Sequence, residues 1–172
     1  MSARQNLRNK IGPADREFVL DDYILYNLVR ASAIYNDEMS DALKSHGLST
    51  VQWRILMLLH DKSPSSVGDL ARRSVTKMPT LTRMLIRMEK GGLVKRRALA
   101  EDRRIVVITM TPKAVKTLHT VQAIGQRVFE RAVEGVDAKE ISTMTAVLKR
   151  IRENFQRSPY DAAEHKNRVR AS

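Results

Sequence analysis

The feature that most constrains the fold is a long apolar stripe near the start of the chain. Between Leu20 and Leu43, apolar residues recur in steps of three and four, the spacing along one face of an α-helix. A helix of about 26 residues that stops at His46-Gly47 is roughly 39 Å long. Because a small core cannot cover a stripe of that length, we expect a second copy of the chain to cover the rest. The stripe consists of Ile24, Leu28, Ala31, Tyr35, Met39 and Ala42.

Five more helices are predicted from apolar periodicity and capping residues. Thr76 is placed to cap the fourth helix, Pro79 lies in its first turn, and Gly91-Gly92 ends it. Asp137 with Glu140 resembles a capping box at the start of the sixth. The six predicted helices cover residues 20–43, 49–61, 67–74, 76–90, 111–132 and 137–155.

Two β-strands are predicted between the fourth and fifth helices, LVKRR at 93–97 and RIVVITM at 104–110, whereas SPSS at 63–66 is predicted to be a loop. The order α-α-α-α-β-β-α-α is that of a mainly α fold with a small β-hairpin. The helix capped by Ser49 is apolar in nearly every direction, so we expect it to be buried between layers. On the helix that Thr111 caps, the residues predicted to face inward are Val115, Leu118, Val121 or Gln122, Val128 or Phe129, and Ala132.

Composition excludes several classes of function. The chain has no cysteine, which rules out disulfides, thiolate zinc sites, cysteine nucleophiles and thiol redox switches. Its four histidines have no metal-ligand spacing, and no nucleophile lies in a recognisable motif, so we expect no metal, no cofactor and no enzymatic activity. The start lacks a signal-peptide core and no stretch approaches the length of a membrane span, which predicts a cytoplasmic protein with no membrane partner.

Positive charge is concentrated in one part of the sequence. The net charge is +12, and residues 72–104 hold eleven Lys and Arg against three acids, a net of 11 − 3 = +8. The segment KRRALAEDRR at 95–104 alone has five positive and two negative residues. An excess kept for solubility would be spread more evenly, so we predict a face that binds a polyanion.

The helices at 67–74 and 76–90 are joined by a tight turn, which is the spacing of a helix-turn-helix. On the second of them, Thr80, Arg83 and Arg87 lie opposite the apolar stripe, and Lys77 lies at its start. Hydroxyl and guanidinium groups suit base edges and phosphates, and an α-helix fits the major groove. We therefore expect this helix to read double-stranded DNA.

A two-stranded hairpin directly after a recognition helix is a wing. We expect Arg96, Arg97 and Arg103 to lie near phosphates, while an arginine at the tip of the wing enters the narrow minor groove. In this interpretation Asp102 pairs with a neighbouring arginine and fixes the shape of the loop, so that another arginine projects.

Three runs, LSTVQWRILMLL, LTRMLIRMEKGGLVKR and EDRRIVVITMTPKA, resemble the MarR family of bacterial winged-helix regulators, with a resemblance that extends over roughly residues 20–155. Asp102-Arg103-Arg104 matches the Asp-x-Arg wing signature of that family. The resemblance implies a homodimer joined by its first and last helices, a pseudo-palindromic operator, and Arg104 as the arginine in the minor groove. Met78-Pro79 departs from the small polar residues common there, and Met78 can contact a thymine methyl group instead.

The predicted organisation has four parts. Residues 1–19 form a flexible arm, 20–47 and 111–156 a helical dimerisation region, 48–110 the winged helix-turn-helix, and 157–172 a flexible basic tail.

The resemblance also implies a small organic effector, bound between the dimer helices and the DNA-binding unit. Tyr26 and Arg30, with Trp53 and Met57 on the next helix, form a set that suits an aromatic acid or its thioester. The alternatives are core packing for Trp53, an intersubunit salt bridge for Arg30 and an internal ion pair for Arg54. The leading prediction for the whole chain is a ligand-responsive repressor, and the alternative is a non-specific architectural DNA-binding protein.

Overall fold

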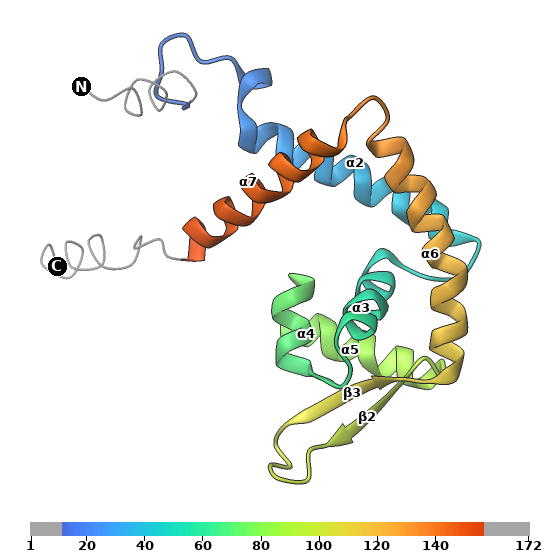
Figure 1. Ribbon diagram of the computed structural model, residues 1–172. Helices are drawn as coiled ribbons and strands as arrows, with labels where there is room; N and C mark the ends of the chain where they lie inside the picture. Colours follow the sequence, from blue (N-terminus) through green and yellow to red (C-terminus); the bar gives the residue numbers. More distant parts are fainter. Residues whose placement is uncertain (1–11, 157–172) are drawn as a thin grey trace, which may run out of the picture. The chain divides into compact units, whose positions relative to one another are not determined.

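The computed structural model describes residues 12–156. Most of the predicted N-terminal arm and all of the predicted basic tail lie outside these residues. The described elements, drawn in Figure 1, are a 3₁₀ turn η1 (Leu20–Asp22), α2 (Ile24–Lys44), α3 (Thr50–Asp61), β1 (Ser65–Ser66), α4 (Val67–Ser74), α5 (Met78–Lys90), β2 (Val94–Ala98), β3 (Val106–Met110), α6 (Pro112–Ala132) and α7 (Ala138–Gln156). The predicted order of six helices with a hairpin after the fourth is confirmed.

The chain forms two compact units, one ending at Phe129 and the other beginning at Glu130. The first unit contains a small antiparallel sheet of order β1-β3-β2. Its third strand was not predicted: Ser65 pairs with Ile108 and Ser66 with Val107, although SPSS was expected to be a loop. Ser65 and Ser66 are too few to show the alternating pattern by which a strand is predicted. They form a strand because they pair with the free edge of β3.

The ends of the first helix differ in part from prediction. Regular α-helix begins at Ile24, because Tyr23 has an extended backbone (φ −80°, ψ 113°) that separates η1 from α2. The helix therefore has 21 residues rather than about 26. Its predicted stop is confirmed, since α2 ends at Lys44 and Gly47 has a positive φ of 64°.

The N-terminus of α5 also differs. Lys77, not Thr76, is its N-cap residue, and no side chain caps the helix. The Thr76 hydroxyl instead donates a hydrogen bond to the carbonyl of Ser74 at 3.2 Å. The predicted end is confirmed: Gly92 has φ 70°, and the Leu93 N–H donates to the carbonyl of Met88 at 2.8 Å, the bond of a Schellman motif.

The core of the first unit is built from the apolar faces of all its helices and from β3. As predicted, α3 is buried or half-buried along most of its length, and Ser49 with Gln52 forms a capping box at its start. On α6, Leu118 and Val121 are buried and Val128 packs against the core, as predicted. Val115, however, is 41% exposed while its neighbour Ala114 is buried, so the prediction was wrong at that position, and Phe129 and Ala132 are exposed as well. The fully buried side chains include Met39, Leu43, Ile55, Leu56, Leu59, Leu70, Leu81, Leu85, Met88, Ile108 and Leu118.

Apolar side chains of α2 and α7 remain exposed in the single chain. On α2, Ile24, Leu28 and Ile34 are 47%, 37% and 57% exposed. No residue of α7 is buried, although its predicted capping box is present: the Glu140 N–H donates to Asp137 Oδ1 at 2.7 Å. Among residues 12–156, no helix is both long enough and apolar enough to cross a membrane.

The turn between α4 and α5 contains a residue in an unfavourable backbone conformation. Val75 has φ 54° and ψ 40°, the left-handed region, and its side chain is 90% exposed. A β-branched residue is rarely found there, because its side chain crowds the backbone. The conformation is held by the helix end, where the Thr76 N–H donates to the carbonyl of Ala71 at 3.1 Å.

Replacing Val75 by asparagine, which tolerates this region, is expected to raise the free energy of unfolding by about 1 kcal/mol. Urea denaturation at a fixed protein concentration measures the effect. Val75→Thr is the matched control, because threonine is polar but keeps the β-branch. Equal stability of Val75→Asn and Val75→Thr would show that the conformation carries no strain.

Candidate nucleic-acid interface

The candidate recognition helix is α5, and its orientation is set by its buried face. Leu81, Leu85 and Met88 are fully buried. Because a helix turns once every 3.6 residues or so, this burial directs the opposite side outward. Thr80, Arg83 and Arg87 are all exposed, as is Lys77 at the N-cap, so the structure brings the four predicted residues of this helix to one exposed region.

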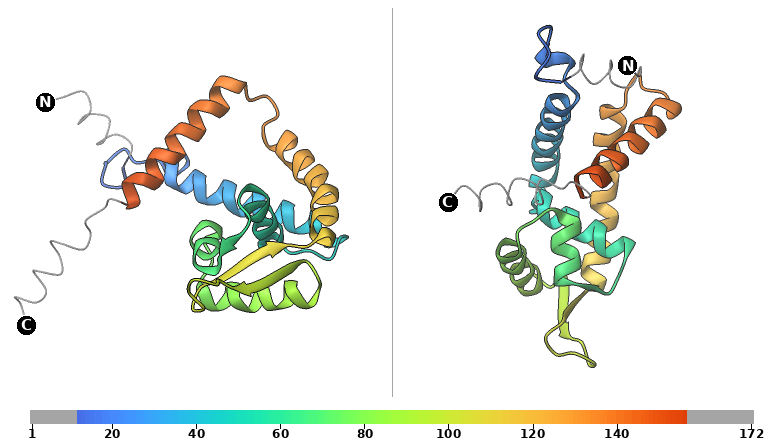
Figure 2. Two further views of the ribbon diagram at one scale, coloured as in Figure 1. Left: turned by 60° about the horizontal axis from the view of Figure 1, so that its bottom comes forward. Right: turned by 90° about the vertical axis from the view of Figure 1, so that its left-hand side faces the viewer.

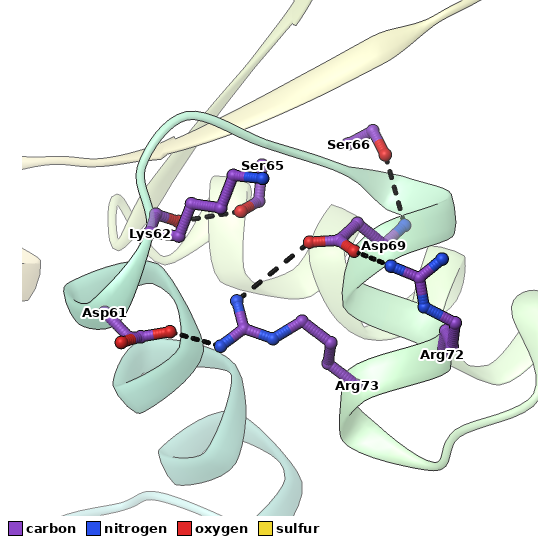
Figure 3. Close-up of polar contacts among 7 residues, drawn as sticks. All are labelled: Asp61, Lys62, Ser65, Ser66, Asp69, Arg72 and Arg73. Atoms are coloured by element: carbon purple, nitrogen blue, oxygen red, sulfur yellow. Dashed lines mark hydrogen bonds and ion pairs between the residues drawn. The ribbon is translucent and has the colours of Figure 1, made fainter. Parts of the chain in front are cut away.

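The helix that precedes it, α4, is tied to α3 by ion pairs. Figure 3 shows the Arg73 guanidinium between the carboxylates of Asp61 on α3 and Asp69 on α4, and Arg72 paired with Asp69. The Ser66 hydroxyl caps α4 by accepting the Asp69 N–H at 3.1 Å. Arg72 and Arg73 are therefore engaged within the protein, although they belong to the basic segment of the sequence.

The wing is the hairpin of β2 and β3, which pair from Val94 with Met110 to Ala98 with Val106. Its loop is closed by the Leu99 N–H, which donates to the carbonyl of Ile105 at 2.8 Å. In Figure 1 and in the right-hand view of Figure 2, this loop projects away from α3, α4 and α5. Residues 101–105 are all exposed.

Asp102 holds the backbone of the wing loop. Its Oδ1 accepts the backbone N–H of Arg104 at 2.9 Å, and its carbonyl accepts the Ile105 N–H at 2.9 Å. The same Oδ1 lies 4.0 Å from Nε of Arg104, whose side chain is 96% exposed. Asp102 thus contacts Arg104 itself, the arginine that was expected to project, rather than a neighbouring arginine. The Arg104 side chain still extends into solvent.

Arg96 connects the wing to the recognition helix. Its backbone N–H donates to Glu89 Oε1 at 3.0 Å, and its Nε donates to Oε2 at 2.7 Å. These hydrogen bonds, the side-chain one foremost, hold the pKa of Glu89 below its ordinary value. Arg96 therefore positions the wing, a role that the sequence did not indicate, because Glu89 is seven residues away on another element.

The remaining cations of the site have no internal counterion. Among residues 12–156, no carboxylate lies within 4.0 Å of Lys77, Arg83, Arg87, Arg97 or Arg103. All five are exposed. An exposed helix face and an adjacent projecting loop with unpaired guanidinium groups can bind phosphates and base edges together.

The end of α5 has two further supports that sequence reasoning missed. The Thr111 hydroxyl donates to the carbonyl of Gly92 at 2.6 Å, and Lys113 Nζ donates to the carbonyl of Gly91 at 2.9 Å. Both residues lie at the start of α6. They satisfy carbonyls that a helix C-terminus leaves without partners, and so tie α6 to the end of α5.

The predicted effector residues do not form one group. A cavity of about 240 Å³ is lined by Tyr35, Asn36, Met39, Thr50, Trp53, Arg54 and Met57. Trp53 and Met57 belong to this lining, but Tyr26 and Arg30 do not. Arg30 is exposed and its guanidinium lies over the Tyr26 ring, 5.5 Å from the centroid, so these two residues lie outside the lining of this cavity.

Two other residues of this region have clear partners. Trp53 packs against α6 so closely that a Cβ added at Gly125 would lie 2.9 Å from its ring. The predicted internal ion pair of Arg54 is wrong, because its partners are neutral: Nη1 donates to the carbonyl of Ser74 at 3.1 Å and Nη2 to Asn36 Oδ1 at 3.2 Å.

The sequence is similar to known transcriptional regulators over most of its length. The family model described as MarR family matches residues 48–106. The HTH-type transcriptional repressor IacR of Pseudomonas putida is 26% identical over 144 residues, which cover 84% of this chain and 86% of that protein. The uncharacterized HTH-type transcriptional regulator YfiV of Bacillus subtilis is 31% identical over 138 residues, covering 78% and 85%.

Solved structures share the fold, and they confirm the predicted winged helix-turn-helix class. Transcriptional regulator PA3341 has a TM-score of 0.73 and 33% identity, covering 79% of this chain and 100% of that one. A MarR mutant from E. coli complexed with operator DNA has a TM-score of 0.65 and 20% identity, covering 72% and 89%. Bordetella bronchiseptica BpsR, whose DNA binding is regulated by 6-hydroxynicotinic acid, has a TM-score of 0.70 and 18% identity, covering 81% and 97%.

The Glu89–Arg96 pair gives a prediction about pH. Because the pKa of Glu89 is lowered in the folded protein, the pair contributes stability above the ordinary carboxyl pKa and loses it as the pH falls through the lowered value. Carbon-13 NMR titration should place the Glu89 pKa below 4.5, and Arg96→Ala should raise it toward 4.5. Arg97→Ala, the matched control, should leave it unchanged. The same pKa in the wild type and in Arg96→Ala would contradict the pairing.

Proposed function

We propose, because this chain belongs to the MarR family of transcriptional regulators, that it represses transcription by binding a pseudo-palindromic operator as a homodimer. The observation that carries the proposal is the exposed, unpaired set of cations on α5 and the wing. A regulator is not an enzyme, which agrees with the absence of a catalytic motif in the sequence. The repressing role is supported by the relative named as a repressor.

On DNA, α5 enters the major groove with Arg83 and Arg87 toward base edges and Thr80 beside them. An arginine that forms two hydrogen bonds to guanine is worth about 1–3 kcal/mol of discrimination. Lys77 contacts a phosphate at the start of the helix. The MarR mutant solved with operator DNA supports this mode of binding, because it shares the fold.

The wing extends the contact into the adjacent minor groove. Arg104 enters the groove while Asp102 holds its backbone, and Arg97 and Arg103 lie against the phosphates. Arg96 keeps the wing at a fixed angle to α5 through Glu89 rather than contacting DNA first. The winged helix-turn-helix at 48–110 is then one structural unit for DNA binding.

A second copy of the chain covers the apolar residues that α2 and α7 leave exposed. Regions 20–47 and 111–156 form this dimer interface. Met144 and Phe155 on α7 are 55% and 64% exposed, and Ile34 on α2 is 57% exposed. A dimer places its two recognition helices about one DNA turn apart, roughly 34 Å, and so matches a pseudo-palindromic site.

A small organic effector releases the dimer from DNA. The cavity of about 240 Å³ beside Trp53 and Met57 is the candidate site. BpsR, whose DNA binding 6-hydroxynicotinic acid regulates, supports this regulation in a protein of the same fold.

Selection of binding sites from a random duplex library tests the proposal. The full-length protein should enrich one pseudo-palindromic sequence and bind it with about 10³-fold or greater preference over random duplex. Arg83→Ala and Arg104→Ala should each weaken binding about 5- to 150-fold, and Arg83→Ala should relax the preference at one base pair.

Arg16→Ala, which removes one exposed positive charge outside the winged helix-turn-helix and outside both proposed interface regions, is the control and should bind as the wild type does. Equal affinity for every duplex would favour the non-specific architectural protein. Unchanged affinity in both arginine variants would rule out this mode of reading.

A further inference from the structure

The first turn of the recognition helix presents an apolar side chain among the cations that face DNA. We propose that Met78 reads the C5-methyl group of a thymine in the major groove, so that each half of the operator contains a T·A pair that the protein selects through this contact. The inference rests on the proposed function, because it names the base that this end of α5 recognises.

Exposed apolar side chains are few in the winged helix-turn-helix and lie where DNA is expected. In this unit, all of which the structure describes, the large apolar side chains that are exposed are Val75, Met78 and Ile105, at 90%, 47% and 40%. Val75 and Met78 lie on either side of Lys77, and Ile105 follows Arg104 on the wing loop. Exposed apolar residues are ordinarily scattered singly over a surface. Their concentration beside the cations indicates a surface that the duplex covers.

Met78 is not part of the core. Met84, on the same helix, is half-buried and packs against the core, whereas nearly half of Met78 is exposed. A second copy of the chain is an unsuitable cover, because Lys77 and Arg83 have no carboxylate within 4.0 Å among residues 12–156, and two copies would bring like charges together. The phosphates of DNA neutralise the same cations. A duplex therefore fits this surface better than a protein partner of the same charge.

The side chains of the first turn favour a methyl group over a polar base edge. Met78, Pro79 and Thr80 are all exposed, and their only side-chain donor is the Thr80 hydroxyl. Pro79 also lacks a backbone N–H. Guanine and adenine present acceptors in the major groove, which require donors, and the methyl group of thymine is the only apolar group there. The flexible, polarisable side chain of methionine adapts well to such a surface.

Helix geometry limits where the thymine lies. Met78 and Arg83 are five residues apart, which is about 7.5 Å along the helix axis. Successive base pairs are about 3.4 Å apart, so the thymine is expected within about three base pairs of the pair that Arg83 contacts. The two-fold symmetry of a dimer repeats the contact in the other half-site.

Replacement of thymine by deoxyuridine tests the contact, because it removes the methyl group and leaves the base pairing unchanged. The full-length protein is titrated with the operator obtained by site selection, in which each symmetric pair of thymines is replaced in turn. At one pair, close to the base pair whose preference Arg83→Ala relaxes, affinity should fall about 10- to 20-fold, or about fourfold for each buried methyl group. A change of less than about twofold at every pair would show that no methyl group is read.

A Met78→Ser variant identifies the side chain responsible. It should bind the thymine and deoxyuridine forms of this operator with equal affinity, because serine presents no comparable apolar surface to the methyl group. Ile105→Ser makes the same kind of change at an exposed apolar residue of the wing, and as the matched control it should keep the wild-type ratio of the two affinities. The wild-type ratio in Met78→Ser would mean that DNA shape or another residue reads the thymine, and the inference would be wrong.

Methylated cytosine provides an independent measurement on the wild-type protein. Exchange of the selected T·A pair for C·G removes the methyl group and changes the polar edge of the pair, whereas 5-methylcytosine restores the methyl group alone. The wild type should bind the 5-methylcytosine operator about 10- to 20-fold more tightly than the cytosine operator, and Met78→Ser should not distinguish the two. Equal binding of both operators by the wild type would overturn the contact.

The outcomes separate this inference from the proposed function. If site selection finds no preferred sequence, the proposed function fails and the inference fails with it. If a pseudo-palindrome is selected but its affinity does not depend on a thymine methyl group through Met78, the regulator stands and only this inference is removed.

Discussion

Burial of one face of α5 is the constraint on which the rest of the DNA-binding unit depends. Leu81, Leu85 and Met88 are each fully buried, and a side chain of this size contributes about 1.5–3 kcal/mol when it leaves water. Rotating the helix would expose these residues, so the packing keeps Arg83 and Arg87 on the outside. The Schellman motif at Gly91-Gly92 then sets the direction in which the chain leaves α5 and begins the wing.

The basic residues of this region divide into those that hold the structure and those that remain available. Arg73 joins α3 to α4, and Arg96 joins β2 to α5. The cations without a counterion gather on the exposed face of α5 and on the wing. The net positive charge of the sequence thus overstates the number of Lys and Arg side chains that are available to bind DNA. The ion pairs of Arg73 and Arg96 hold the helices and the wing in place, and so fix the positions of the available cations.

Signals that act between near neighbours were predictable from the sequence. The cap residue Ser49 and the capping pair Asp137–Glu140 were recognisable because a capping side chain bonds to a group only about three residues away. What failed depends on distant partners. β1 exists only because β3 offers a free edge, and Ala114 replaces Val115 in the core because packing decides which side of α6 faces inward.

The same distinction applies to the candidate site. The outward positions of Thr80, Arg83 and Arg87 follow from helical periodicity, and were predicted. The partners of Arg96 and Arg54 were not, because Glu89 and Ser74 lie on other elements, seven and twenty residues away. The sequence also did not show that Arg54, rather than Arg30, lines the cavity, because that depends on how α2 packs against α3.

Cleavage of operator DNA from the wing tests the central claim most directly. The chain has no cysteine, so Ala100→Cys creates a single attachment point for an iron chelate on the wing loop. A dimer with its wings in the minor groove should cut the selected operator in two groups of positions, placed symmetrically on either side of its centre. Cuts spread evenly along the duplex, or a single group at the centre, would contradict the account.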